Sequence, residues 1–209
     1  MRWLTLAAVV APPLVLAGIG VSHPHELSAA SAPWWTNMHI ILAAVFPLLA
    51  VGHWVLLRGI GGPLAWASRI AAFLYIGYYG ALDALAGVGT GTLVQDGLSA
   101  GGGHHAPDGR DPAITSLFVV GNDLGYFGAY CFVAAGVLTA VVLYRGVGAR
   151  AIPGGVVLVA ASALFSQKHI YWPLGVISQL GLAAGFGLLA WALPVAREEA
   201  PVRQAVAVA

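Results

Sequence analysis

Two histidines stand fourteen residues apart in the apolar stretch NMHIILAAVFPLLAVGHWVLL, which runs from Asn37 to Leu57. Fourteen residues is close to four helical turns, so His39 and His53 share one face of a helix, about 21 Å apart along its axis. An ionisable side chain costs free energy in hydrocarbon, and for that reason it is by default a candidate for function. The two imidazoles are therefore candidate functional groups.

Two carboxylates share this apolar setting, and a third histidine follows a further apolar segment. His39 and Asp83 are each expected about 5 Å below one membrane surface, counted from the helical rise per residue, and Asp123 is expected nearer the mid-plane. We expect His39, Asp83, Asp123 and His169 to line one pocket that faces outward. A carboxylate beside an imidazole orients the ring and raises its basicity. Asp83 and His39 also have structural interpretations, as a helix-end residue and an interfacial residue.

The polar loops hold further side chains of the kind that bind metals. One loop contains HPHE, His23–Glu26, and another contains GGGHHAPDGRD, Gly101–Asp111, with His104 and His105 adjacent. Imidazole nitrogen suits Zn(II) and Cu(II), whereas the single cysteine, Cys131, offers no thiolate cluster for Cu(I). The leading hypothesis is a copper or zinc site with His39, Asp83, Asp123 and His169 as ligands and with His104 and His105 at its mouth. Ordinary polar connectors are the alternative for these loops.

The spacing of His39 and His53 also resembles that of the haem-ligating histidines in di-haem b-type cytochromes. In that family each haem is held by histidines from two facing helices, so two haems require four histidines at matched depths. Here only His169 lies beside a second apolar segment. The resemblance therefore implies at most one haem b, with His39 and His169 as axial ligands, in a membrane electron carrier. His53 is then predicted to be a lone buried histidine, hydrogen-bonded to a neighbouring helix.

The composition places these residues in a membrane protein. Of the 209 residues, 59% are hydrophobic and only 8% are charged, whereas about a quarter of the residues of a soluble domain are charged. The 28 glycines favour close contact between transmembrane helices. The formal net charge is only +1 and no basic stripe occurs, so no nucleic-acid partner is expected. The partner that the composition implies is the lipid bilayer.

Six apolar segments are long enough to cross a bilayer, and each is bounded by glycine, proline or charge. The sequence thus predicts one all-α domain with six transmembrane helices. The first segment is longer than the apolar region of a signal peptide, and we expect it to stay as an uncleaved helix. The predicted spans are residues 3–22, 36–57, 64–90, 113–144, 151–168 and 173–194.

The basic residues predict the orientation of these spans. Seven arginines fall on one side, whereas only Arg110 and Lys168 fall on the other. Because loops rich in Lys and Arg stay in the cytoplasm, both termini are predicted to be cytoplasmic, in a multi-pass protein of the cell membrane. The seven are Arg2, Arg58, Arg69, Arg145, Arg150, Arg197 and Arg203.

Glycines four residues apart in GNDLG, Gly121–Gly125, and in GLAAG, Gly181–Gly185, predict flat seams for helix packing. Through such seams the chain would contact other membrane subunits or a second copy of itself. A third hypothesis follows, in which the protein is an accessory subunit without a site of its own. None of these patterns separates an enzyme from an ion-handling or binding protein.

Overall fold

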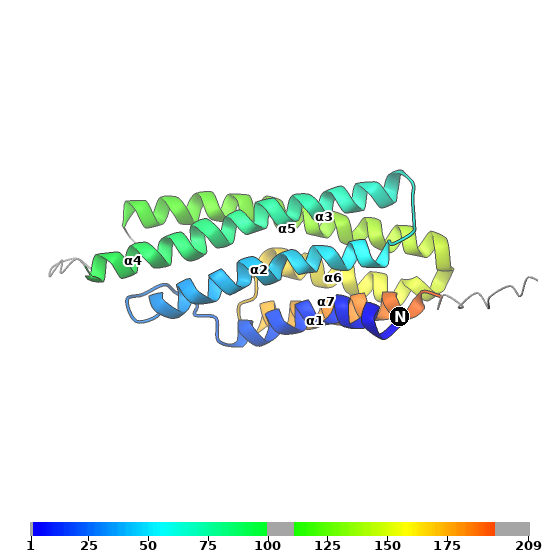
Figure 1. The fold of residues 1–209 in the computed structure, drawn as a ribbon, viewed down its shortest axis with the longest axis horizontal. Coiled ribbons are helices and arrows are strands. Elements are labelled where there is room, and N and C mark those ends of the chain that lie inside the picture. The colour runs from blue at the N-terminus through cyan, green and yellow to red at the C-terminus, as the bar shows by residue number, and fades with distance from the viewer. Residues whose placement is uncertain (1, 100–110, 195–209) are drawn as a thin grey trace, which may run out of the picture.

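The computed structural model describes residues 2–99 and 111–194, and within these ranges the chain is a bundle of helices without strands (Figure 1). Seven α-helices lie roughly along one axis, and two short segments of other helix types, η1 and η2, connect some of them. The elements are α1 Arg2–Val21, α2 Ala32–Leu56, α3 Pro63–Leu82, η1 Asp83–Gly89, α4 Thr90–Ser99, α5 Pro112–Val147, η2 Gly148–Ala151, α6 Ile152–Lys168 and α7 Leu174–Ala192.

The described residues contain five helical segments that are long and apolar enough to cross a membrane. Four of them are α1, α2, the continuous helix of α3, η1 and α4 as far as Gly97, and α7. The fifth, Pro112–Lys168, is 57 residues long and includes α5, η2 and α6. An all-helical protein of the membrane type, as the composition predicts, is thereby confirmed.

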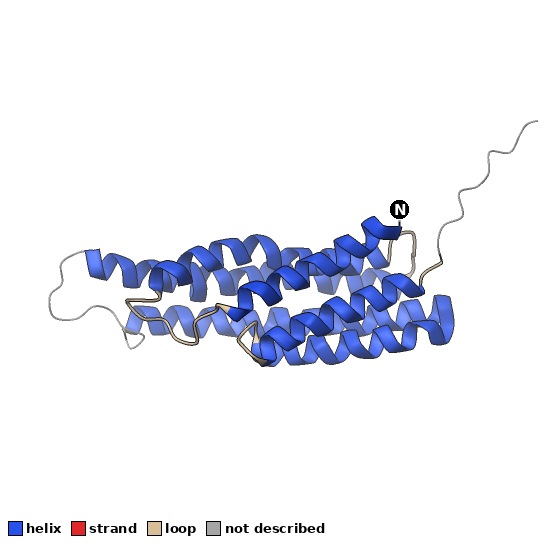
Figure 2. Cartoon of the chain, turned by 90° about the horizontal axis from the view of Figure 1, so that it is seen from below, coloured by secondary structure: helices blue, strands red, loops and turns tan. Residues whose placement is uncertain are grey.

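The first and last described helices meet at one end of the bundle. The Arg2 guanidinium donates a hydrogen bond of 2.8 Å to the carbonyl of Trp191 and lies 3.6 Å from the centre of its indole ring. At the same end, Arg69 donates to the carbonyls of Leu57 and Ile60 and so closes the turn between α2 and α3. Figure 2 shows that the helices lie roughly parallel to the long axis of the bundle. We call the end that carries Arg2 and Arg69 the arginine end.

The helices differ in length, and this difference creates the setting for the site. The helices α1, α6 and α7 have 20, 17 and 19 residues, which at about 1.5 Å per residue match the thickness of a hydrocarbon core. The helix α5 has 36 residues and α2 has 25. Away from the arginine end, α2, α4 and α5 therefore extend beyond α1, α6 and α7 (Figure 1). A step forms where the three shorter helices end.

Aromatic side chains fill the interior below this step. Phe46, Tyr75, Phe132 and Phe165 are fully buried, and the rings of Tyr75 and Phe132 lie 4.8 Å apart between centroids. Phe165 in turn lies 5.8 Å from Phe132 and 6.0 Å from Phe46. These contacts tie α2, α3, α5 and α6 together directly beneath the candidate site.

One helix continues further than its sequence predicts. The span predicted to end at residue 90 passes through η1, a π-helical segment, and on to Ser99. Glycine usually weakens a helix, but here Gly87 and Gly91 let α2 approach the backbone. A methyl group at Gly91 would meet the hydroxyl of Thr36, and one at Gly87 would meet the ring of His39. Tertiary packing thus overrides the low helix propensity.

The two glycine seams pack inside the chain. A methyl group at Gly121 would lie 2.9 Å from Cβ of Ala86, and one at Gly181 would lie 2.8 Å from Cβ of Ala161. The seams therefore join η1 to α5 and α6 to α7. Their predicted role in helix packing is confirmed, and in this fold they are occupied by the chain itself.

Candidate metal centre

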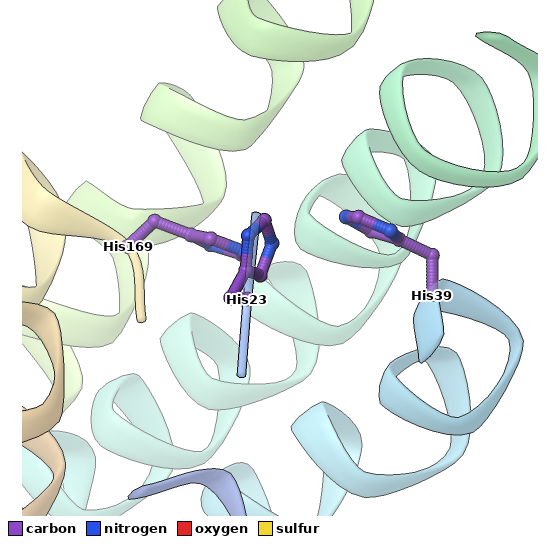
Figure 3. A group of neighbouring side chains, drawn as sticks. All are labelled: His23, His39 and His169. Atoms are coloured by element: carbon purple, nitrogen blue, oxygen red, sulfur yellow. The ribbon is translucent and has the colours of Figure 1, made fainter. Parts of the chain in front are cut away.

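Three histidines from distant parts of the chain meet at the step. One nitrogen from each of His23, His39 and His169 lies within 4.8 Å of the others. The ring of His23 lies between the other two, 5.3 Å from that of His39 and 5.4 Å from that of His169 (Figure 3). Such a spacing allows one metal ion to bind all three imidazoles.

The helix α2 supplies His39 two turns after its start. The side chain is 4% exposed, and its ring lies against the backbone of η1 at Gly87. A π-helical turn is wider than an α-helical one and is often found at functional sites. The carbonyls of Ala86 and Gly87 accept hydrogen bonds from the indole N–H of Trp35, at 3.3 and 3.0 Å. Trp35 thereby fixes the widened turn that packs against His39.

The loop after α1 supplies His23, which is 4% exposed although it follows the helix directly. Its backbone N–H donates to the carbonyl of Gly20, at 3.3 Å, in the last turn of α1. Its ring packs edge-on against Trp35 and against Tyr171, with centroids 5.3 and 4.3 Å apart. These contacts hold a loop residue among helices.

The end of α6 supplies His169, which has a φ of 50°. A positive φ is uncommon for any residue other than glycine and persists only where the surroundings impose it. Here the turn into α7 is tightly packed, since a methyl group at Gly20 or at Gly175 would meet the backbone of Ile170. This backbone conformation directs the His169 ring toward the other two (Figure 3).

Hydrogen bonds orient all three imidazoles through Nδ1. His39 Nδ1 lies 2.8 Å from the carbonyl oxygen of Trp35, and His23 Nδ1 lies 2.8 Å from that of Pro24. A carbonyl only accepts, so each Nδ1 carries the proton and each Nε2 of the neutral ring carries the lone pair. His169 Nδ1 pairs with the hydroxyl of Tyr79. This is how metal-ligating histidines are oriented in proteins.

The protonation of His23 agrees with this role. Burial lowers its pKa to about 4, although the hydrogen bond to Pro24 raises it and the nearby His39 and His25 lower it further. The ring is therefore neutral at physiological pH and free to donate its lone pair. Its Nε2 is buried and has no hydrogen-bond partner among the described residues. Burial also raises the pKa of Tyr171 to about 12, so this neighbour stays a neutral phenol.

Of the predicted site residues, the structure brings His39 and His169 together, and it adds His23. Asp83 is fully buried at the start of η1, and neither of its carboxylate oxygens has a hydrogen-bond partner among the described residues. It does not belong to the histidine group. Asp123 lies on an exposed face of α5 and is also outside the group. His104 and His105 lie outside the described residues.

The other histidine of the opening pair has a separate setting. His53 is fully buried, and its Nδ1 lies 2.9 Å from the hydroxyl of Thr139 on α5. That hydroxyl lies 2.9 Å from the hydroxyl of Ser68, which donates to the carbonyl of Ala135 at 3.1 Å. The prediction of a buried histidine bonded to a neighbouring helix is confirmed.

Sequence reasoning did not place His23 in the pocket. The signal was present, because the HPHE loop is one of the two concentrations of metal-binding side chains in the sequence. The sequence does not reveal the path of that loop. The loop turns inward at His23 and leaves His25 exposed, stacked on Tyr171.

No protein-family model, curated protein or solved structure matches this chain. The proposed function therefore rests on the geometry of the site. Fold and site together define a helical protein of the membrane type with a candidate three-histidine metal centre at the step where the shorter helices end.

Proposed function

We propose that this protein crosses the cell membrane six times and binds one transition-metal ion, zinc or copper, between His23, His39 and His169. The observation that carries the proposal is the orientation of the imidazoles. Three rings converge, and each engages an oxygen through Nδ1. Three histidines with a further coordination position left open are the ligand set of many catalytic zinc sites.

The energetics of the cluster support a metal ion over a purely structural role. His23 and His39 are almost fully buried, and Nε2 of His23 is buried without a hydrogen-bond partner among the described residues. Such an atom costs about 1–3 kcal/mol, and an ion bound to it would remove this cost. Imidazole donors suit Zn(II) and Cu(II).

The position of His23 favours a bare ion over haem b. A haem ligated by His39 and His169 needs a porphyrin plane between these two rings. The ring of His23 lies there instead, 5.3 and 5.4 Å from its neighbours.

Six crossings are supported by the course of the chain. The segment Pro112–Lys168 reverses at η2, because α5 and α6 lie side by side in Figure 1 and the glycine at 155 faces Ala140. Counting it as two crossings makes an even number, which agrees with Arg2 and Trp191 meeting at one end. By the positive-inside rule the arginine end is cytoplasmic and the metal centre faces outward.

Metal analysis of the purified, full-length protein tests the proposal. We expect about one equivalent of zinc or copper per chain, its loss on treatment with a chelator, and its recovery on reloading. His23→Gln and His39→Gln should each reduce the bound metal strongly. His25→Gln is the matched control, since it removes an exposed histidine two residues from His23. A wild-type protein that takes up no metal, or equal loss in the control, would refute the proposal.

A further inference from the structure

A cavity of about 150 Å³ adjoins the metal centre. It lies between η1, α5 and the end of α6, and both His39 and His169 form part of its wall. Any molecule in the cavity would therefore lie beside two of the three proposed metal ligands. A cavity at this place can hold a substrate or a ligand of the metal site.

The size and walls of the cavity suit one flat apolar ring. An apolar cavity of about 150 Å³ is large enough to bind benzene. Aromatic side chains line this one, including Trp35, Tyr79, Phe118 and Phe165. Aromatic rings pack favourably against one another in edge-to-face or offset arrangements.

The polar atoms at the cavity favour a negative charge on the ligand. Among the described lining residues, Lys168 alone carries a full charge, and none is acidic. Lys168, Gln167 and Asn122 are exposed and mark the mouth of the cavity. An ammonium and two amides can all donate hydrogen bonds to an anion. Asp123 adjoins Asn122 in sequence but does not line the cavity.

We infer that this cavity binds a single-ring aromatic anion, a carboxylate or a phenolate, beside the metal ion. The ring lies among Trp35, Phe118 and Phe165, and the anionic group is bound by Lys168 at the mouth. The inference rests on the proposed function, because it names the class of ligand that the same site receives. A fatty acid or lipid headgroup also carries an anionic group, but its chain does not fit a cavity of one ring.

Ligand titrations of the metal-loaded, full-length protein test the inference. Benzoate is the probe, benzamide is its neutral counterpart and octanoate represents a lipid-derived carboxylate. We expect benzoate to bind with a Kd below about 1 mM and benzamide to bind at least about tenfold more weakly, which corresponds to the loss of about 1.4 kcal/mol. Octanoate should not compete with benzoate.

Two variants assign the binding to this cavity. Lys168→Met changes an exposed side chain and should weaken benzoate binding about tenfold while leaving the metal content unchanged. Ala129→Leu fills the cavity from the α5 wall and should abolish benzoate binding. If Ala129→Leu does not fold, Lys168→Met decides the result alone.

The outcomes separate this inference from the proposed function. A protein that holds metal but binds no benzoate overturns the inference and leaves the metal centre standing. Stronger binding of octanoate, or benzoate binding that both variants leave unchanged, also overturns it. A protein that holds no metal but binds benzoate through Lys168 and Ala129 refutes the metal centre and supports the cavity as an aromatic-anion site.

Discussion

The hydroxyl of Tyr79, on α3, forms a hydrogen bond with Nδ1 of His169, at the end of α6. With a metal ion on Nε2, Nδ1 carries the proton and donates it to the phenol oxygen. The two rings also stack, with centroids 5.8 Å apart. Tyr79 is therefore the residue that orients His169 toward the other two histidines.

Replacing this partner should weaken the metal site without removing a ligand. Tyr79→Phe keeps the ring and deletes the acceptor, and loss of such an outer partner typically costs about 10–100-fold in metal affinity. Competition against a chromophoric chelator measures the effect. Tyr78→Phe is the matched control, because Tyr78 packs on Phe127 instead. Equal affinities in Tyr79→Phe and the wild type would show that Tyr79 does not orient the ligand.

A methyl group added at Gly87, in η1, should disturb the metal site through His39. In Gly87→Ala the new Cβ meets the His39 ring, and overpacking of this kind costs about 1–3 kcal/mol of folding free energy. We expect lower metal affinity together with a lower midpoint of thermal unfolding in detergent. Gly80→Ala, in α3, is the control, because nothing lies within 4 Å of a Cβ added there. Retention of full metal affinity in Gly87→Ala would contradict the packing argument.

The helical architecture could be predicted from the sequence because a backbone in hydrocarbon has to form its hydrogen bonds within its own helix. His39 and His169 could be identified because an ionisable side chain in or beside an apolar run is costly and is by default a candidate for function. His23 also follows an apolar run, but whether its ring turns into the bundle depends on contacts with Trp35 and Tyr171. No periodicity in the sequence reports those contacts.

The depth of a residue in the membrane is hard to predict for a different reason. A count of residues from the start of each span assumes that all spans begin at one level, and on that assumption Asp123 is expected near the mid-plane. In the structure α5 extends beyond α6, and Asn122 lines the same cavity as Lys168 at the end of α6. Residues ten positions into α5 thus lie level with the ends of the shorter helices, and only the packing of helices of unequal length reveals it.

The inner hydrogen-bond network should affect stability and leave the metal site unchanged. Thr139→Val replaces the hydroxyl that joins His53 to Ser68 by a methyl group. It leaves the buried Nδ1 of His53 without its partner, at a cost of about 1–3 kcal/mol, whereas Ser68 keeps its bond to Ala135. Unfolding in a denaturing detergent should therefore occur more readily, with unchanged metal content. Thr139→Ser keeps the hydroxyl and should retain most of the stability. Loss of metal in Thr139→Val would mean that the two sites are coupled.

The orientation of the bundle can be tested with single cysteines in a Cys131→Ala background. Ala29→Cys lies in the exposed loop between α1 and α2, and Gly61→Cys lies in the turn between α2 and α3, where nothing lies within 4 Å of an added Cβ. Arg69 ties this turn to the arginine end, which the positive-inside rule assigns to the cytoplasm. A membrane-impermeant maleimide should label position 29 in intact cells and position 61 only after permeabilisation. The reverse pattern would place the three histidines on the cytoplasmic side and would make the cytoplasm the source of their ion.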